Sequence, residues 1–242
     1  MAGKMQQREE YGLDAPGVLR RLVLIGLALG LAGLAALDGL PLLGLSLLPA
    51  GLVCLAMAGW MLASSLWLKR RLVQTLLDQR IWRGDETILD IGSGRGLAAV
   101  NAARRAPAGH VHALDLWQSA DLSGNGPEGL RRNAEIAGVA GRLTIDTGDA
   151  RALPYGDQRF DVVLSMTALH NIDTAEGRAQ AIVELWRVTR PGGQILLFDI
   201  RYAPAYRRQL SALGARDVML SRPVFLWGIA GHRLSAFKPA ED

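Results

Sequence analysis

Hydrophobic and polar positions divide the chain into two unequal parts. Between Leu22 and Leu68 the only charged residue is Asp38, whereas the rest of the chain mixes charged, polar and apolar residues. A helix that crosses a membrane needs about 20 predominantly apolar residues. Asp38 opens an Asp-Gly-Leu-Pro sequence, which is a turn signal between the two apolar runs. The pattern therefore predicts a transmembrane helical hairpin with spans near residues 19–37 and 46–68.

The basic residues beside this hairpin predict its orientation. Arg20 and Arg21 precede the first span, and Lys69, Arg70 and Arg71 follow the second, while the turn contains no Lys or Arg. Cytoplasmic flanks of membrane spans carry an excess of Lys and Arg. We therefore expect an integral membrane protein with both termini in the cytoplasm and the lipid bilayer as a partner. A cleaved signal peptide, a re-entrant hairpin and a buried pair of core helices are the alternatives.

Charge and cysteine content exclude several other classes. The net charge is +4, of which residues 1–71 contribute +3 and the remainder +1. The basic character thus belongs to the membrane flanks, and no basic run follows a phosphate backbone, so no nucleic-acid partner is expected. The single cysteine, Cys54, lies in the apolar part, which rules out an intrachain disulfide and a cysteine-based metal site. No metal centre is expected.

Beyond the hairpin, short apolar strands alternate with amphipathic helices. Helices are expected at 72–82, 97–105, 127–137, 175–189 and 203–213, and strands at 87–91, 110–114, 142–145, 160–165, 194–200, 217–220 and 232–237. This alternation predicts an α/β domain with a doubly wound parallel sheet, which binds ligands at the carboxyl ends of its strands. The predicted organisation is a cytoplasmic segment (1–17), two membrane helices (18–71) and a catalytic domain (72–242).

Three sequence features fall at the expected carboxyl ends of strands. Gly92, Gly94 and Gly96 follow the first strand and precede a helix, where a backbone without side chains approaches a ligand closely. Asp115 ends the second strand, where a carboxylate can accept hydrogen bonds from both ribose hydroxyls; an ordinary acid at the end of a strand is the alternative. Asp149 follows the third strand and is placed to accept from an adenine amino group, with a turn residue or a helix cap as the alternatives.

Four segments in this order and spacing resemble the class I S-adenosylmethionine (SAM)-dependent methyltransferases. They are ILDIGSGRG (88–96), HALDLW (112–117), TGDARALPYGDQRFDVVLSMTALHNI (147–172) and ELWRVTRPGGQILLFDI (184–200). The resemblance covers residues 72–242 and is greatest to the enzymes that methylate small molecules and lipid precursors. It implies a seven-stranded Rossmann-like methyltransferase sheet, whose last strand is antiparallel, and SAM as the cofactor.

The resemblance also implies roles for individual residues. The implied contacts to the methionine moiety come from Asp90, Gly92 and Gly94. Those to the ribose and adenine come from Asp115, Leu116 or Trp117, Asp149 and Ala150. Ser165 approaches the methionyl end and the transfer site.

His170, just beyond the fourth strand, is the candidate general base. A loop histidine that only packs against the cofactor is its alternative. The apolar segment 223–228 has three interpretations, namely a wall for the acceptor, a membrane contact and core packing.

The predicted function is therefore a SAM-dependent methyltransferase that acts at the membrane on a small, lipophilic acceptor. Two alternatives stay open, an NAD-dependent oxidoreductase and a non-catalytic SAM-binding membrane module. The sequence does not indicate the acceptor atom or the oligomeric state.

Overall fold

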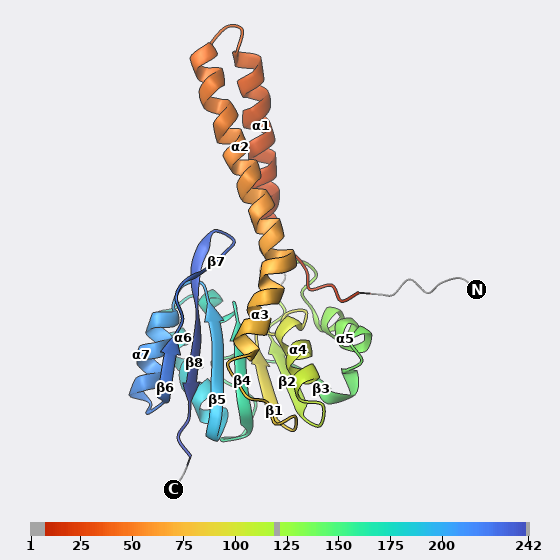
Figure 1. Cartoon of the computed structure of the whole chain (residues 1–242), viewed down its shortest axis with the longest axis vertical. Helices are drawn as coiled ribbons and strands as arrows, with labels where there is room; N and C mark the ends of the chain where they lie inside the picture. Colours follow the sequence, from red (N-terminus) through yellow and green to blue (C-terminus); the bar gives the residue numbers. More distant parts are fainter. Residues whose placement is uncertain (1–7, 119–121, 241–242) are drawn as a thin grey trace, which may run out of the picture.

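The computed structural model describes residues 8–118 and 122–240, which form a helical hairpin standing on an α/β domain (Figure 1). The hairpin consists of α1 (Pro16–Ala36) and α2 (Pro41–Ala63). A π-helical stretch (Ser64–Leu68) joins α2 to α3 (Lys69–Leu77), so one unbroken helix runs from the hairpin into the domain. The other strands and helices are β1 (Thr87–Ile91), α4 (Leu97–Arg105), β2 (His110–Asp115), α5 (Pro127–Ile136), β3 (Leu143–Thr147), β4 (Phe160–Met166), α6 (Ala175–Val188), β5 (Thr189–Asp199), α7 (Ala203–Ala212), β6 (Arg216–Leu220), β7 (Val224–Leu226) and β8 (Ile229–Phe237).

By length and composition, both hairpin helices could cross a membrane. Only 11% and 17% of the residues in their most apolar windows are buried, so most of their leucines face outward. Small residues let the two helices approach closely, because a Cβ at Gly51 would lie 2.8 Å from the carbonyl oxygen of Gly26. The second helix begins at Pro41 rather than near residue 46, since proline suits the first turn of a helix.

The sheet has the strand order β3-β2-β1-β4-β5-β8-β6, with β7 paired to β8 outside this path. Strands β1 to β5 are parallel, and β8 lies antiparallel between β5 and β6. The expected α/β sheet with an antiparallel last strand is confirmed, and β7 adds an eighth strand that was not predicted. Because β8 runs down to the C-terminus in Figure 1, the parallel strands point their carboxyl ends toward the hairpin.

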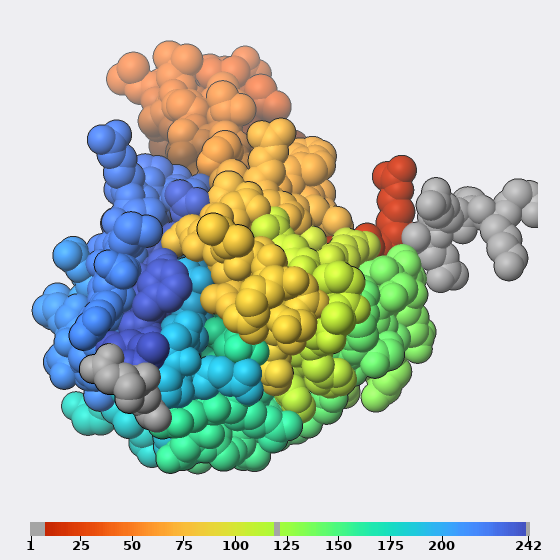
Figure 2. All heavy atoms as spheres, turned by 60° about the horizontal axis from the view of Figure 1, so that its bottom comes forward, coloured from red at the N-terminus to blue at the C-terminus, as the bar shows by residue number. Residues whose placement is uncertain are grey.

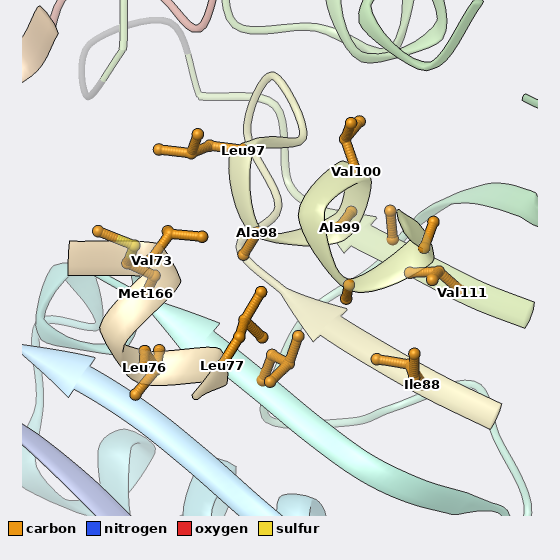
Figure 3. Close-up of a cluster of buried hydrophobic side chains, with 14 of the residues drawn as sticks. Val73, Leu76, Leu77, Ile88, Leu97, Ala98, Ala99, Val100, Val111 and Met166 are labelled. Atoms are coloured by element: carbon orange, nitrogen blue, oxygen red, sulfur yellow. The ribbon is translucent and has the colours of Figure 1, made fainter. Parts of the chain in front are cut away.

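Helices cover both faces of the sheet. One buried cluster joins α3, α4 and α5 to the sheet, and a second joins α6 and α7 to its other face. Val73, Leu76 and Leu77 of α3 are buried against Ile88 of β1 and Met166 of β4 (Figure 3). Burying each such side chain contributes about 1.5–3 kcal/mol. This packing fixes the helix that leaves the hairpin to the catalytic sheet.

Helix α3 is shorter than expected and ends at Leu77 rather than residue 82. The indole N–H of Trp82 donates to the carbonyl oxygen of Leu77, which satisfies a free carbonyl of the last turn. Figure 2 shows the same region, in gold, on the surface between the blue C-terminal strands and the green residues around α5.

Candidate functional site

The glycine loop between β1 and α4 has a backbone that only glycine accommodates well. Gly92, Gly94 and Gly96 all have positive φ angles, of 70°, 52° and 84°. A Cβ at Gly92 would lie 2.0 Å from the Cβ of Ala168, so no side chain fits there. Gly96 precedes the first turn of α4, whose free N–H groups face the end of the sheet.

Asp115 organises this loop from the neighbouring strand. Its carboxylate accepts hydrogen bonds from the backbone N–H groups of Gly94 at 2.7 Å and Trp117 at 2.7 Å. These two bonds hold the carboxylate at the carboxyl end of β2, directly beside the glycine loop. Each oxygen keeps further acceptor capacity for ligand hydroxyls.

Asp90, at the end of β1, is a buried carboxyl group without a partner. It is 1% exposed, and neither of its carboxylate oxygens has a hydrogen-bond partner. Burial raises the pKa of Asp90 to about 7; the backbone N–H of Ala99 opposes this increase, and the negative charge of Asp115 adds to it. A buried carboxyl group with a raised pKa at a cavity is a marker of functional sites.

These elements enclose one cavity of about 300 Å³ at the carboxyl ends of the strands. Of the residues predicted from the sequence, seven line it: Asp90, Gly92, Gly94, Asp115, Leu116, Asp149 and Ala150. The carboxylate of Asp149 forms a two-pronged ion pair with Arg151, which holds the pKa of Asp149 below its usual range. Asp149 therefore lines the cavity as a carboxylate paired with Arg151 and not as a free one.

Three other predicted residues lie outside the lining. Trp117 donates its indole N–H to Thr147 at 2.8 Å, and Ser165 donates its hydroxyl to the carbonyl oxygen of Ile91 at 2.9 Å. Nδ1 of His170 lies 3.2 Å from Oδ1 of Asp199 without hydrogen-bond alignment. The flanking residues of His170 line the cavity but His170 does not, so the geometry gives no support to a base at this position.

Part of the wall comes from residues that sequence reasoning did not connect with the site. Tyr11 and Asp14 precede α1, Lys69 opens α3, and all three line the cavity. Nζ of Lys69 donates to Oδ1 of Asp14 at 2.6 Å, and both side chains are about nine-tenths buried. In the sequence, Lys69 stands out only as a basic flank of the second apolar run. No local signal links it to Asp14, which lies 55 positions earlier. Within the described ranges, no group of three His, Cys, Asp or Glu residues gathers as a metal site.

Comparisons with known proteins agree with this geometry. Residues 89–197 match a family model described as a methyltransferase domain. The ubiquinone/menaquinone biosynthesis C-methyltransferase UbiE of Roseobacter denitrificans is 32% identical over 131 residues, which cover 54% of this chain and 49% of that relative. The 27-O-demethylrifamycin SV methyltransferase of Amycolatopsis mediterranei is 33% identical over 135 residues, covering 56% and 46%. A SAM-dependent methyltransferase from Aquifex aeolicus shares the fold, with a TM-score of 0.52, 16% identity and coverage of 68% and 88%.

Residues 89–197 form a SAM-dependent methyltransferase domain. The cofactor of this domain is S-adenosylmethionine. The chain as a whole spans about half the length of the curated relatives it matches.

The lining residues fit this cofactor in their polar chemistry. Buried polar atoms without partners occur on Asp90, Ser93, Asn125, Tyr11 and Asp14, all of which line the cavity. Buried polar atoms in folded proteins are normally hydrogen-bonded, and a ligand with an ammonium group and ribose hydroxyls would supply partners for them. The glycine loop leaves room for its backbone to approach such a ligand.

Replacing Asp115 with Asn is expected to weaken SAM binding. Hydrogen bonds to a charged acceptor contribute about 1.5–3 kcal/mol, so the dissociation constant should rise about 10- to 100-fold. Isothermal titration of the full-length protein in detergent measures this change. Glu135→Gln, an exposed acid on α5, is the matched control. An unchanged affinity in Asp115→Asn would remove Asp115 from the ribose site.

Asp90 should make the ligand-free protein less stable as pH rises. Its pKa in the folded state, about 7, lies above the value of 3.8 expected in the unfolded chain. The unfolded state therefore loses its proton first, and stability decreases from about pH 4 to pH 7 before levelling off. Asp90→Asn lacks this group, so its stability relative to the native protein should be higher at pH 8 than at pH 5, by a few kcal/mol at about 1.4 kcal/mol per pKa unit. Urea unfolding at the two pH values tests this, and an equal difference at both would contradict it.

Proposed function

We propose that the protein is a membrane-anchored SAM-dependent methyltransferase that acts on a small, lipophilic acceptor. The methyltransferase domain faces the cytoplasm, and helices α1 and α2 cross the bilayer. The proposed organisation keeps the boundaries expected from the sequence, with membrane helices within 18–71 and the catalytic domain over 72–242. Residues 1–7 of the N-terminal segment lie outside the described residues.

One observation carries the proposal, namely that the cavity lies on the side of the domain from which the apolar hairpin extends, and residues that flank the hairpin line it. The parallel strands point their carboxyl ends toward the hairpin (Figure 1). Lys69, directly after the stretch Ser64–Leu68, lines the cavity together with Asp14, which lies two residues before the start of α1. A cavity at the foot of a membrane hairpin suits an acceptor that arrives from the lipid.

The exposure of the hairpin supports a membrane location. Its outward surface includes large apolar side chains such as Leu31, Leu42 and Leu52, and it extends away from the folded domain. Monomeric soluble proteins rarely expose so large a continuous apolar surface. The basic residues at the domain end, with none in the connecting turn, support a cytoplasmic location of both termini.

The relatives support a small-molecule acceptor. One of them is named for ubiquinone and menaquinone biosynthesis, and the other for a rifamycin intermediate. Quinones with long side chains dissolve in membranes, which agrees with an anchored enzyme. One relative transfers to carbon and the other to oxygen, so both acceptor atoms stay within the proposal.

The residues at the site act by positioning. SAM supplies a methyl group already activated by its sulfonium, so the protein mainly aligns the acceptor with the S–CH₃ bond and excludes water. Asp115 orients the ribose, and the carboxylate of Asp90 is available to the ammonium group. Met166 and Thr167, at the end of β4, line the part of the cavity next to Ala168 and the glycine loop. A deprotonating group is required only if the acceptor must lose a proton in the transition state.

Neither alternative function is favoured. An NAD-dependent oxidoreductase disagrees with the methyltransferase match over residues 89–197. A non-catalytic SAM-binding module would share the cavity, and only turnover separates it from an enzyme.

Transfer of labelled methyl groups tests the proposal. Membranes that contain the full-length protein are incubated with methyl-labelled SAM, and label is counted in volatile, organic and aqueous fractions. Gly94→Asp should abolish transfer, because Gly94 has a positive φ and even a Cβ there would lie 3.0 Å from Cδ2 of Leu122, in the segment between β2 and α5. Gly138→Asp is the matched control, since Gly138 also has a positive φ but has open space around it.

Label in the organic or volatile fraction, lost in Gly94→Asp and kept in Gly138→Asp, is the expected result. Absence of label from every fraction despite demonstrable SAM binding would contradict the enzyme and favour the non-catalytic module.

A further inference from the structure

The tip of the β7–β8 hairpin is an exposed apolar projection of the catalytic domain. Strand β7 pairs with the first residues of β8 outside the main path of the sheet, with Phe225 opposite Ala230. Phe225 is 58% exposed and Ile229 is 40% exposed. Residues 223–231 contain no charged side chain. Figure 1 shows this tip rising from the domain toward the foot of the helical hairpin.

Contacts with the foot of the hairpin fix the position of this tip along the axis of the helix α2–α3. The backbone N–H of Trp227 donates to Oγ of Ser64, in the π-helical stretch that follows α2. Leu226 is fully buried in the same core cluster as α3, and Trp227 packs against that cluster. The tip is therefore attached beside Ser64 and does not lie free in solvent.

The register of α1 against α2 shows which residues of α1 lie at the same depth as Ser64 in the proposed membrane. Gly26 lies against Leu55, and Gly33 lies against Leu48. At the foot of the hairpin, the N–H of Asp14 donates to Oγ of Ser65.

By the same spacing, Arg21 and Arg20 lie level with Trp60 and Met61. Ser64 is about three to four residues, or about 5 Å, further toward the catalytic domain. Arginine side chains at that depth extend their charge to the headgroups while their stems stay apolar. The tip at Ser64 is thus level with the headgroup region rather than with bulk water.

Two exposed tryptophans on the helix also indicate that Ser64 lies in the headgroup region. Trp60 and Trp67 are 49% and 67% exposed and lie above and below Ser64 along the helix. Tryptophan is enriched at the boundary between lipid and water, where its ring and its N–H both find suitable surroundings. Arg222, at the base of the tip, is exposed and is suited to lipid phosphates.

We infer that the β7–β8 tip is a second membrane contact, in which Phe225 and Ile229 enter the boundary between headgroups and acyl chains. This inference rests on the proposed function, because it takes the hairpin as the membrane anchor. The tip adds a contact from a second element to the continuous helix α2–α3, and so further restricts the tilt of the domain against the bilayer. The mouth of the cavity is thereby held toward the bilayer from which the acceptor comes.

Site-specific fluorescence tests the contact in the full-length protein. In a Cys54→Ala background, single cysteines replace Phe225, Leu52 or Ala140 and carry an environment-sensitive dye. Leu52 lies on the exposed surface of α2, and Ala140 is exposed at the opposite end of the sheet, before β3. The proteins are placed in vesicles of phosphatidylcholine and phosphatidylglycerol, with and without nitroxide-labelled phosphatidylcholine. Ile229→Cys gives a second, independent position on the tip.

The expected result is blue-shifted emission and quenching by nitroxide lipid at positions 225, 229 and 52, but not at 140. Quenching at 52 together with water-like emission at 225 and 229 would overturn the tip contact and leave the anchor intact. Absence of quenching at 52 would overturn the membrane anchor and with it the tip contact. SAM binding by each labelled variant confirms that the domain is folded.

Discussion

A buried ion pair between Lys69 and Asp14 connects the helical hairpin to the cavity at the carboxyl ends of the strands. Their charged atoms lie 2.6 Å apart, and both side chains are about nine-tenths buried. Breaking such a pair by removing one partner costs about 3–5 kcal/mol, because the remaining charge is left without compensation. Asp14 belongs to the segment before α1 and Lys69 to the helix after α2, so the pair closes the hairpin at its foot.

Two serines at the same level extend this connection in two directions. Ser65 accepts a hydrogen bond from the N–H of Asp14, and Ser64 accepts one from Trp227 in the β7–β8 tip. Both serines belong to the π-helical stretch, a type of irregularity that often occurs at functional sites. The N-terminal strap (residues 8–15) continues from Asp14 across the domain, where Leu13 bonds to Ser123 through both its N–H and its carbonyl oxygen. These contacts therefore join the helical hairpin, the strap and the cavity wall.

Much of the fold and the centre of the site could be predicted from the sequence. Asp90 and the glycine loop lie at the carboxyl end of β1, and Asp115 is the last residue of β2. Their positions follow from the local backbone geometry of strand ends. Alternating apolar strands and amphipathic helices likewise depend on local patterns. The last strand was expected antiparallel only through the resemblance to a family.

The remaining features depend on contacts between distant segments. Lys69 meets Asp14 only because the hairpin folds back on itself, and β7 becomes a strand only by pairing with β8. The side chain of His170 is directed to Asp199, at the end of β5, and away from the cavity. A lysine next to a membrane span has an obvious local interpretation as a topology signal, and that interpretation concealed its place in the wall.

The central claim is that the helical hairpin and the cavity form one unit through Lys69 and Asp14. SAM affinity of Lys69→Met, Asp14→Leu and the double variant, measured in detergent by isothermal titration, tests it most directly. The account predicts weaker binding in each single variant and partial recovery in the double variant, which leaves no unpaired charge. Single variants that bind SAM as tightly as the native protein would contradict the account, because the hairpin would then be only a tether.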